Sequence, residues 1–247
     1  MIFGDFHTHS KFSDGSGTIE ENYAVAVTKG LKQLGCTEHG LRHIAFGTKR
    51  RNLPIERKIV DKLNEKNEIE VLLGIEANIF TSKGEIDLLP NDYQWFDFIV
   101  AAYHKTATNP SVLDYLKFNA KGLFRKEFTK KEIQVFTKSY VKAICSGKVD
   151  IISHLFYGMP MDTKQIAQAA ADHGVFIELN GKKVSIPDED INILAENKKV
   201  KFIINSDAHS PSRVGDFSVP MAVVERLGID KNRITNWNQL VKFNRKK

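Results

Sequence analysis

The chain has 247 residues, of which 42% are hydrophobic and 27% charged, a composition that fits a globular protein with a sizeable core. We expect a single domain over residues 1–247, because no linker, repeat or low-complexity tract divides the sequence. The net charge of +6 is modest and consists largely of dispersed lysine, so charge alone does not indicate nucleic-acid binding.

Signals for export or for a membrane are not visible in the sequence. The first ten residues lack a basic region followed by a long apolar run, and nowhere do eighteen apolar residues follow one another. Two cysteines, Cys36 and Cys145, are too few for a disulfide framework, and both are interpreted as small buried hydrophobic residues. We therefore expect a cytoplasmic protein that does not interact with membranes.

Short apolar runs alternate with longer amphipathic ones along the chain. The first helix has clear ends, with Thr18 as its cap and Gly30 at its close. Helices are predicted at 18–30, 54–66, 129–147, 162–173 and 187–197, with short closing helices at 220–227 and 237–243. Strands are predicted at 2–6, 31–37, 69–75, 96–103, 149–153, 175–179 and 200–205. This alternation favours parallel strands, in a barrel or a doubly wound sheet.

Residues that can bind metals stand where the predicted strands end. In parallel α/β folds, the carboxyl ends of the strands form one rim, where active sites are built. A chance distribution of eight histidines would not follow the strand ends in this way. The sequence therefore predicts that six residues converge in one pocket, namely His7, His39, Glu76, His104, His154 and Asp207.

Two short patterns indicate that this pocket binds metals. In His7-Thr8-His9 both imidazoles point to the same side of an extended chain, because side chains alternate with a period of two. Asp207-Ala208-His209 repeats the pattern after the last predicted strand, and Asp14 follows the first pair within a turn. Imidazole and carboxylate ligands together suit zinc, manganese or iron. We therefore predict a site for divalent metals.

Each of these residues also has an ordinary structural interpretation. Taken singly, His104 and His154 could be core histidines that bond to backbone carbonyls. Glu76 could cap the next segment, and Asp14 could stabilise the turn at Gly15. Only their shared position at one rim weakens these alternatives.

Further polar residues are assigned different roles. His173 precedes Gly174 late in a helix, where a histidine favours the negative helix end, and it is interpreted as structural. His43 lies in the loop after His39 and could contact a substrate. The basic run Lys49-Arg50-Arg51 could bind an anionic substrate, because clustered cations attract phosphates.

The order and spacing of these motifs resemble the PHP (polymerase and histidinol phosphatase) family, and in particular its stand-alone bacterial phosphoesterases. The resemblance runs from residue 2 to the last predicted helix. Its motifs are His7-Thr8-His9, Ser13-Asp14-Gly15, Thr37-Glu38-His39, Gly74-Ile75-Glu76, His104, Ile152-Ser153-His154 and Ser206-Asp207-Ala208-His209.

The resemblance implies a fold and a set of metal ligands. The fold would be a distorted (β/α)7 barrel, a TIM-like architecture, with up to three divalent metals drawn from zinc, manganese and iron. Asn180 stands where the family has a polar residue close to the site, and it could contact substrate. The implied ligands are His7, His9, Glu76 and Asp207 for the first metal, Glu76, His104 and His154 for the second, and Asp14, His39 and His209 for the third.

Two positions depart from the family pattern. Glu38 stands where many relatives have aspartate, so we expect its longer side chain to change the contact to His39. Asp14 stands where some relatives have histidine, and its harder oxygen favours manganese or iron at the third site.

The implied activity is hydrolysis of phosphate esters by hydroxide held between metals at Glu76. His39 and His209 are candidate proton donors only if they do not bind metal. The preferred substrate is a small phosphomonoester, such as histidinol phosphate or a nucleotide phosphate. A nucleic-acid end is the second choice and a phosphoprotein the third. The alternatives to a phosphoesterase are a metal hydrolase of the amidohydrolase type and a non-catalytic scaffold stabilised by metal.

Overall fold

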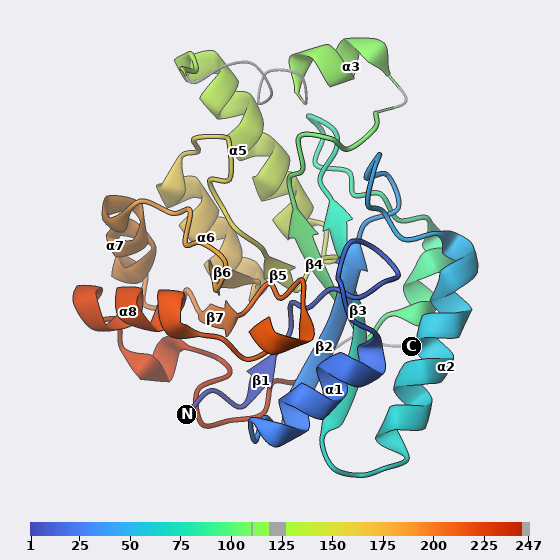
Figure 1. Cartoon of the computed structure of the whole chain (residues 1–247). Coiled ribbons are helices and arrows are strands. Elements are labelled where there is room, and N and C mark those ends of the chain that lie inside the picture. The colour runs from blue at the N-terminus through green and yellow to red at the C-terminus, as the bar shows by residue number, and fades with distance from the viewer. Residues whose placement is uncertain (110, 119–126, 244–247) are drawn as a thin grey trace.

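The computed structural model describes residues 1–109, 111–118 and 127–243. In this part of the chain, seven strands form one sheet in the order β1 to β7, and each neighbouring pair is parallel. Most helices lie between successive strands on the outside (Figure 1). The strands are β1 Gly4–Asp5, β2 Gln33–His39, β3 Glu70–Asn78, β4 Phe98–Ala102, β5 Ile151–Ile152, β6 Phe176–Asn180 and β7 Phe202–Asn205.

The first and last strands approach each other beyond their carboxyl ends. Thr8 and Ala208 form a parallel bridge. The amide of His9 donates to the carbonyl of Ala208 at 2.8 Å, and the amide of Ala208 donates to the carbonyl of His7 at 3.2 Å. The sheet is therefore nearly closed, and the predicted (β/α)7 barrel is confirmed.

The helices begin and end close to where the sequence places them. Thr18 forms a capping box with Glu21 at the start of α1, and α6 ends at His173, next to Gly174 in the left-handed conformation (φ 66°). The structure adds the six-residue α3, which was not predicted. The helices are α1 Ile19–Thr28, α2 Leu53–Asn64, α3 Val112–Lys117, α5 Lys130–Cys145, α6 Thr163–His173, α7 Asp188–Glu196 and α8 Ser218–Leu227.

Aromatic rings fill the amino-terminal half of the barrel. The ring of Phe98 lies edge-on to Phe6, with 5.9 Å between ring centroids, and stacks on Phe243 at 4.6 Å. A Cβ atom on Gly74 would stand 2.6 Å from the Phe98 ring, so the absence of a side chain there makes room for it. This packing closes one end of the barrel, and the other end is left for a site.

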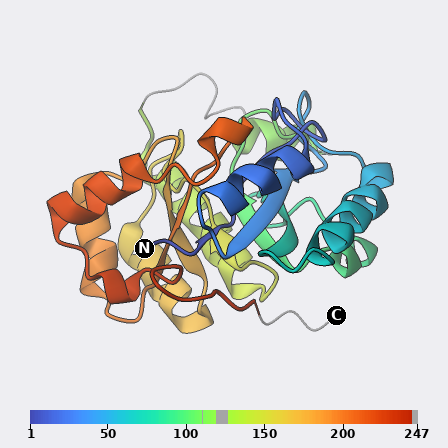
Figure 2. The ribbon, with the colours of Figure 1, turned by 60° about the horizontal axis from the view of Figure 1, so that its bottom comes forward.

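The predicted helix at 237–243 is wrong. Within this segment, the backbone of Val241 both donates to and accepts from the side-chain amide of Gln33, at 2.8 and 2.9 Å. Together with the packing of Phe243 into the barrel, these bonds require an irregular, non-helical chain. Figure 2 shows the segment running across the amino end of the barrel.

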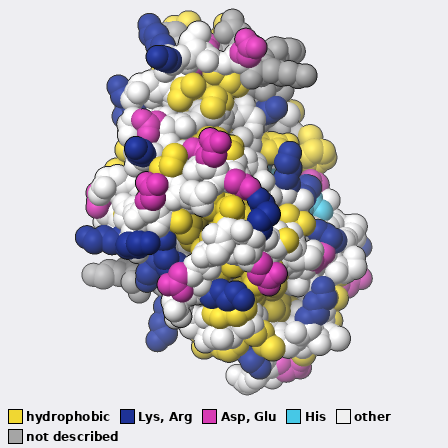
Figure 3. Space-filling model, turned by 90° about the vertical axis from the view of Figure 1, so that its left-hand side faces the viewer, with side chains coloured by type: hydrophobic (Ala, Val, Ile, Leu, Met, Phe, Trp, Pro, Cys, Tyr) yellow, Lys and Arg dark blue, Asp and Glu magenta, His cyan; other side chains and the backbone are white. Residues whose placement is uncertain are grey.

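The two cysteines differ in environment. Cys36 is buried in β2 as predicted, whereas Cys145 is exposed at the last position of α5, so the prediction that it is buried is wrong. In the described part of the chain, no helix is long and apolar enough to span a membrane. Figure 3 shows basic and acidic side chains interspersed over much of the face that includes α7 and α8, so the positive net charge forms no continuous stripe on that face.

Candidate metal centre

A cavity of about 460 Å³ lies at the carboxyl ends of the strands. His7 and His9 lie beneath it with no exposed surface. The other seven predicted ligands line the cavity, namely Asp14, His39, Glu76, His104, His154, Asp207 and His209. The structure therefore brings all nine predicted ligands to one place.

Glu76, buried near the end of β3, is the centre of this cluster. Its Oε1 lies 2.8 Å from His154 Nε2 and 3.4 Å from His7 Nε2. Its Oε2 lies 2.7 Å from His39 Nδ1 and 3.4 Å from His104 Nε2. Imidazoles that follow or end β1, β2, β4 and β5 thus meet at one carboxylate.

Asp207 is the second carboxylate of the cluster. Its Oδ1 lies 3.3 Å from His9 Nε2 and 3.4 Å from His209 Nδ1. Both Asp207 (φ 52°) and His154 (φ 25°) adopt positive backbone angles, which only a few per cent of residues other than glycine adopt. Backbone strain of this sort is retained mainly where the position of a side chain matters for function.

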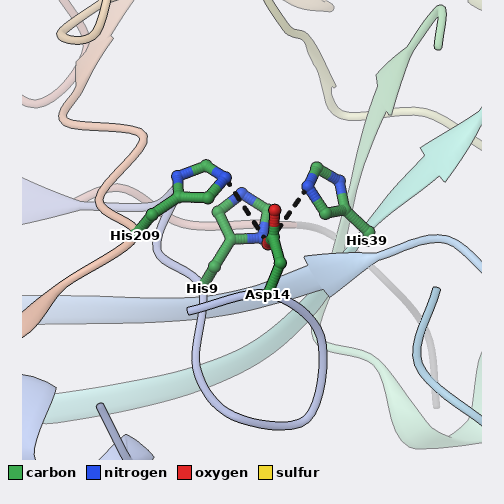
Figure 4. Close-up of side chains that lie close together, drawn as sticks. All are labelled: His9, Asp14, His39 and His209. Atoms are coloured by element: carbon green, nitrogen blue, oxygen red, sulfur yellow. Dashed lines mark ion pairs between the residues drawn. The ribbon is translucent and has the colours of Figure 1, made fainter. Parts of the chain in front are cut away.

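A third carboxylate, Asp14, lies nearer the solvent. Figure 4 shows it between two imidazoles, with Oδ1 at 3.3 Å from His39 Nε2 and at 3.5 Å from His209 Nε2. His9 completes this set, whose ligand atoms all lie within 4.8 Å of one another. The four residues come from the loop after β1, the end of β2 and the loop after β7.

Three sets of residues in the described chain can each hold a metal ion. The set with Asp14 contains the three ligands implied for the third metal and adds His9. The other two sets share Glu76, but they differ from the implied ones, because the first lacks Asp207 and the second has His39 in place of His154. They are His7, His9 and Glu76, and His39, Glu76 and His104.

Hydrogen bonds to Nδ1 atoms fix the orientation of three imidazoles. Glu178 Oε1 lies 2.8 Å from Nδ1 of His7, and Asn78 Oδ1 lies 2.8 Å from Nδ1 of His104. Nδ1 of His209 lies 3.0 Å from the carbonyl of Asp207. Since all three acceptors require a proton on Nδ1, the Nε2 atoms are left free to bind a metal.

Glu178 was not singled out from the sequence. Its two oxygens accept from five groups, which are Nδ1 of His7, Oγ of Ser153, the amide of His154, and the side-chain amides of Asn180 and Asn205. It is fully buried in β6. The signal that could have revealed it is a lone glutamate in an otherwise apolar strand, two residues before Asn180 and therefore on the same face.

Glu38 supports a loop, and no hydrogen bond joins it to His39 within the described residues. It accepts from the amide and hydroxyl of Ser10, at 3.0 Å and 2.5 Å, and from the hydroxyl of Ser13. These two serines flank the segment that leads from His9 to Asp14. The longer side chain of Glu38 therefore contacts the loop that carries Asp14.

The carboxylates give the cavity a negative potential. Burial alone would lower the pKa of His7, but Glu178, Asp207 and Glu76 raise it well above its usual value. Likewise, burial would lower the pKa of His39, but Glu76 and Asp14 raise it to about 10. Burial would raise the pKa of Glu76, yet the surrounding histidines hold it well below its usual range. The carboxylates therefore favour positive charge at His7 and His39, whereas burial and the neighbouring His39 lower the pKa of His9 to about 3.

Several buried polar atoms of the cluster have no hydrogen-bond partner. Among them are Nε2 of His7, Oδ1 of Asp14 and Oε2 of Glu76. Nδ1 of His39 and Oε2 of Glu76 are 2.7 Å apart without the geometry of a hydrogen bond. Buried polar atoms are normally paired, so ligand atoms that face one another in this way fit a bound cation. These residues therefore fit the divalent metals that the family implies.

The predicted basic run lies outside the cavity lining. Lys49, Arg50 and Arg51 lie at the start of the short 3-10 helix that leads into α2, and Arg50 pairs with Asp92 at 3.0 Å. The cations that line the cavity are instead the exposed Lys182 and Lys183, which follow β6. Contact of the predicted run with substrate therefore stays a prediction.

His43 and Asn180 both line the cavity, and both bond to protein groups. Nδ1 of His43 accepts from the amide of Phe46 at 3.1 Å, and its Nε2 lies 2.8 Å from the hydroxyl of Thr106. Asn180 donates to Asp207 at 3.1 Å and to Glu178 at 2.8 Å. In the structure, each residue positions a neighbour in the cavity.

The barrel and the residues at its strand ends define a class, the TIM-like barrels that carry their chemistry at this rim. Residues 5–182 match the PHP domain, so the chain belongs to the PHP domain family. It is 30% identical, over 98% of its length, to a probable phosphatase of Vibrio parahaemolyticus, 93% of which is covered. It is 31% identical, over 94% of its length, to a probable phosphatase of Shewanella halifaxensis, 87% of which is covered.

A solved structure shares the fold. The crystal structure of histidinol phosphate phosphatase from Lactococcus lactis, in complex with zinc, L-histidinol and phosphate, matches with a TM-score of 0.64 at 18% identity. The match covers 92% of this chain and 94% of that chain. It independently supports the barrel architecture described above.

Proposed function

We propose that this chain, a metal-dependent phosphoesterase, hydrolyses small phosphomonoesters in the cavity above Glu76. The observation that carries the proposal is the meeting of four imidazoles at one buried carboxylate, with two more carboxylates nearby. The family membership and the relatives described as probable phosphatases support the same reaction class.

Up to three divalent cations would be held by the nine ligands, with zinc, manganese and iron all compatible with their nitrogen and oxygen donors. When bound, such cations would offset the negative charge of a phosphate and make water a better nucleophile at neutral pH. Asp14 gives its group a harder ligand than a further imidazole would, which favours manganese or iron there.

The chain's own residues position these groups. Glu178 and Asn78 hold His7 and His104 with their Nε2 atoms towards the cluster. Glu76 reaches two of the three ligand sets, so it is the central catalytic residue of the proposal. His39 and His209 would pass a proton to the leaving alcohol only where no cation occupies their ring nitrogens.

The size of the cavity favours a small substrate. Its volume of about 460 Å³ falls in the range of pockets for small molecules, roughly 300–1,000 Å³. The fold neighbour from Lactococcus lactis is described with L-histidinol and phosphate, which illustrates a phosphomonoester on the same barrel. A phosphomonoester such as histidinol phosphate or a nucleotide phosphate is therefore proposed ahead of a nucleic-acid end.

The test combines elemental analysis with hydrolysis of p-nitrophenyl phosphate in the presence of manganese. The wild-type chain is expected to contain divalent metal and to release phosphate. Glu76→Gln is expected to lose at least one metal equivalent and to lower turnover about 100-fold or more, because the carboxylate that belongs to two of the ligand sets loses its charge. Glu70→Gln is the matched control, since Glu70 is exposed at the opposite end of the same strand.

The competing functions predict different results. An amidohydrolase would release amine from model amides and no phosphate from phosphomonoesters, and a nuclease would hydrolyse only oligonucleotide ends. A scaffold would bind metal and turn over no phosphoester in the panel. Full activity in Glu76→Gln would contradict the proposed site itself.

A further inference from the structure

Two aromatic rings stand half-exposed at the mouth of the cavity. Phe46 is 48% exposed and Tyr157 is 50% exposed, and both line the same cavity as Glu76. Single exposed hydrophobic side chains are common on protein surfaces and need no explanation. These two differ because each is held in place from the cluster beneath it.

Phe46 is anchored through His43. The amide of Phe46 donates to Nδ1 of His43 at 3.1 Å, so the proton of that imidazole is on Nε2, which donates to Thr106 at 2.8 Å. The His43 ring stacks on the ring of His39, with 5.0 Å between centroids and 22° between planes. The Phe46 ring lies 5.3 Å from the His43 ring. Phe46 is thus positioned relative to a proposed metal ligand.

Tyr157 is anchored through His154. Its amide donates to the carbonyl of His154 at 3.0 Å, and its ring lies 5.3 Å from the His154 ring. The turn that makes this contact has positive φ at Phe156 (71°) and Gly158 (75°), and Phe156 packs against the core. The unfavourable angle at Phe156 is retained where it places Tyr157 beside the cavity.

The two rings stand at the ends of a continuous series of ring contacts over the floor of the cavity. Successive centroids along the series are 4.9 to 5.3 Å apart, and every ring in it lines the cavity. The series comprises Phe46, His43, His39, His104, His154 and Tyr157. A phosphate held at Glu76 would therefore leave its alcohol part near these two aromatic side chains.

Two lysines complete the mouth. Oδ1 of Asn180 accepts from the amides of Lys182 and Lys183, at 2.9 and 3.2 Å, which fixes the turn after β6. Both side chains are exposed and line the cavity. Across the described residues, neither ammonium group forms an ion pair with a carboxylate, so both are available to an anionic group of the substrate.

We propose that the mouth of the cavity binds the alcohol part of the substrate as a planar aromatic ring. Phe46 and Tyr157 would contact the ring, and Lys182 and Lys183 would pair with a second anionic group on it. This assignment rests on the proposed phosphomonoesterase activity and specifies its substrate class. Ring contacts of this kind add attraction beyond apolar burial, because the face and edge of an aromatic ring carry opposite partial charges.

The first test separates a ring from equal apolar bulk. The substrates are 2-phenylethyl phosphate and 2-cyclohexylethyl phosphate, whose leaving alcohols have closely similar acidity. The wild-type chain is expected to show a kcat/KM about fivefold higher for the phenyl compound, the effect of one or two aromatic contacts. Phe46→Leu and Tyr157→Leu keep apolar bulk and are each expected to bring this ratio towards one. Ile44→Ala, in the same loop as Phe46 but outside the cavity lining, should leave it unchanged.

The second test concerns the lysines. Adding a carboxylate at the para position of 2-phenylethyl phosphate is expected to lower KM about fivefold at low ionic strength, and the double substitution Lys182→Gln, Lys183→Gln should remove that gain. If the double variant instead weakens every phosphate equally, the lysines bind the reacting phosphate, and this part of the proposal is wrong.

The outcomes distinguish failure of the aromatic subsite from failure of the proposed phosphomonoesterase activity. Equal kcat/KM for the phenyl and cyclohexyl compounds in the wild type would overturn the aromatic subsite while leaving the phosphomonoesterase intact. A ratio that persists in both leucine variants would do the same. If neither compound nor p-nitrophenyl phosphate is hydrolysed, the proposed function has failed, and the subsite with it.

Discussion

Two parts of the ligand cluster differ in how firmly the protein holds them. The inner group consists of His7, His9, Glu76 and Asp207, whose side chains are 0 to 9% exposed. The outer group consists of His39, Asp14 and His209, whose side chains are 9%, 20% and 24% exposed, respectively. The most exposed outer ligands, Asp14 and His209, both lie in loops, after β1 and after β7.

The inner group is also held more directly by hydrogen bonds from neighbouring residues than the outer group is. Glu178, itself fixed by five hydrogen bonds, holds His7 from below. The loop of Asp14 is instead held one step away, through the contacts of Glu38 with Ser10 and Ser13. Because a ligand that is already in place loses little freedom on binding, we expect the inner group to bind metal more tightly than the outer group.

The largest effect on metal binding and turnover should follow substitution of Glu178, which supports His7 of the inner group. Glu178→Gln replaces one oxygen by an amide that cannot accept, so Glu178's five donors compete for one carbonyl. Loss of such a support typically weakens metal binding about 10- to 100-fold, and we expect phosphatase turnover to fall about 100-fold. Metal titration followed by elemental analysis of the dialysed variant would measure the change.

Glu196→Gln, at the exposed end of α7, is the control for this substitution. Circular dichroism separates loss of metal from loss of fold, since the variant must be compared as a folded protein. A folded Glu178→Gln chain that retains all its metal would show that the inner group does not depend on its buried support.

A smaller effect is expected at the outer group. Asp14→Asn keeps the shape of the side chain but removes its charge, which His39 and His209 both face. One metal equivalent should be lost while the inner metals stay, and we expect turnover to fall about tenfold, no more than the loss of a group that supports a ligand typically costs. Elemental analysis at several free-metal concentrations would measure this. Loss of all metals together would show that the groups are not independent.

The contrast between the groups also explains what the sequence could reveal. His7, Glu76 and Asp207 were predictable because parallel strands bring their carboxyl ends to one rim, whatever the helices do. The pairing of Asp14 with His209 needed the closure of the barrel at Thr8 and Ala208, which no local pattern encodes.

The misses share a physical cause, which is that distant contacts override local pattern. Lys182 and Lys183 line the cavity because Asn180 fixes their turn, whereas the denser run at Lys49 starts a helix elsewhere. The segment at 237–243 has a helix-like composition, but its conformation is set by Gln33 and by the interior of the barrel. Neither outcome is visible without the three-dimensional neighbours.

The smallest expected effect is on the free energy of unfolding, and it comes from Glu56, which supports the backbone of His39 through Thr48. Glu56 is 1% exposed in α2 and bonds to the hydroxyl of Thr48, whose amide donates to the carbonyl of His39. Burial, and then the charge of Glu38, raise the pKa of Glu56 from 4.5 to about 8. The folded chain therefore retains a proton that the unfolded chain releases above about pH 4.5. The free energy of unfolding should accordingly fall as pH rises through this window, and level off above about pH 8.

Glu56→Gln cannot lose that proton, so its stability should change less between pH 5 and pH 8. Glu56 can contribute at most about 1.4 kcal/mol per pH unit to the slope of the free energy of unfolding against pH. Urea unfolding with a chelator present would measure it without a contribution from metal binding, and Glu65→Gln, exposed at the end of the same helix, is the control. Parallel pH profiles for wild type and Glu56→Gln would mean that Glu56 is ionised in the folded protein. The support behind His39 would then include a buried negative charge, and the outer group would be more strongly cation-binding than its exposure indicates.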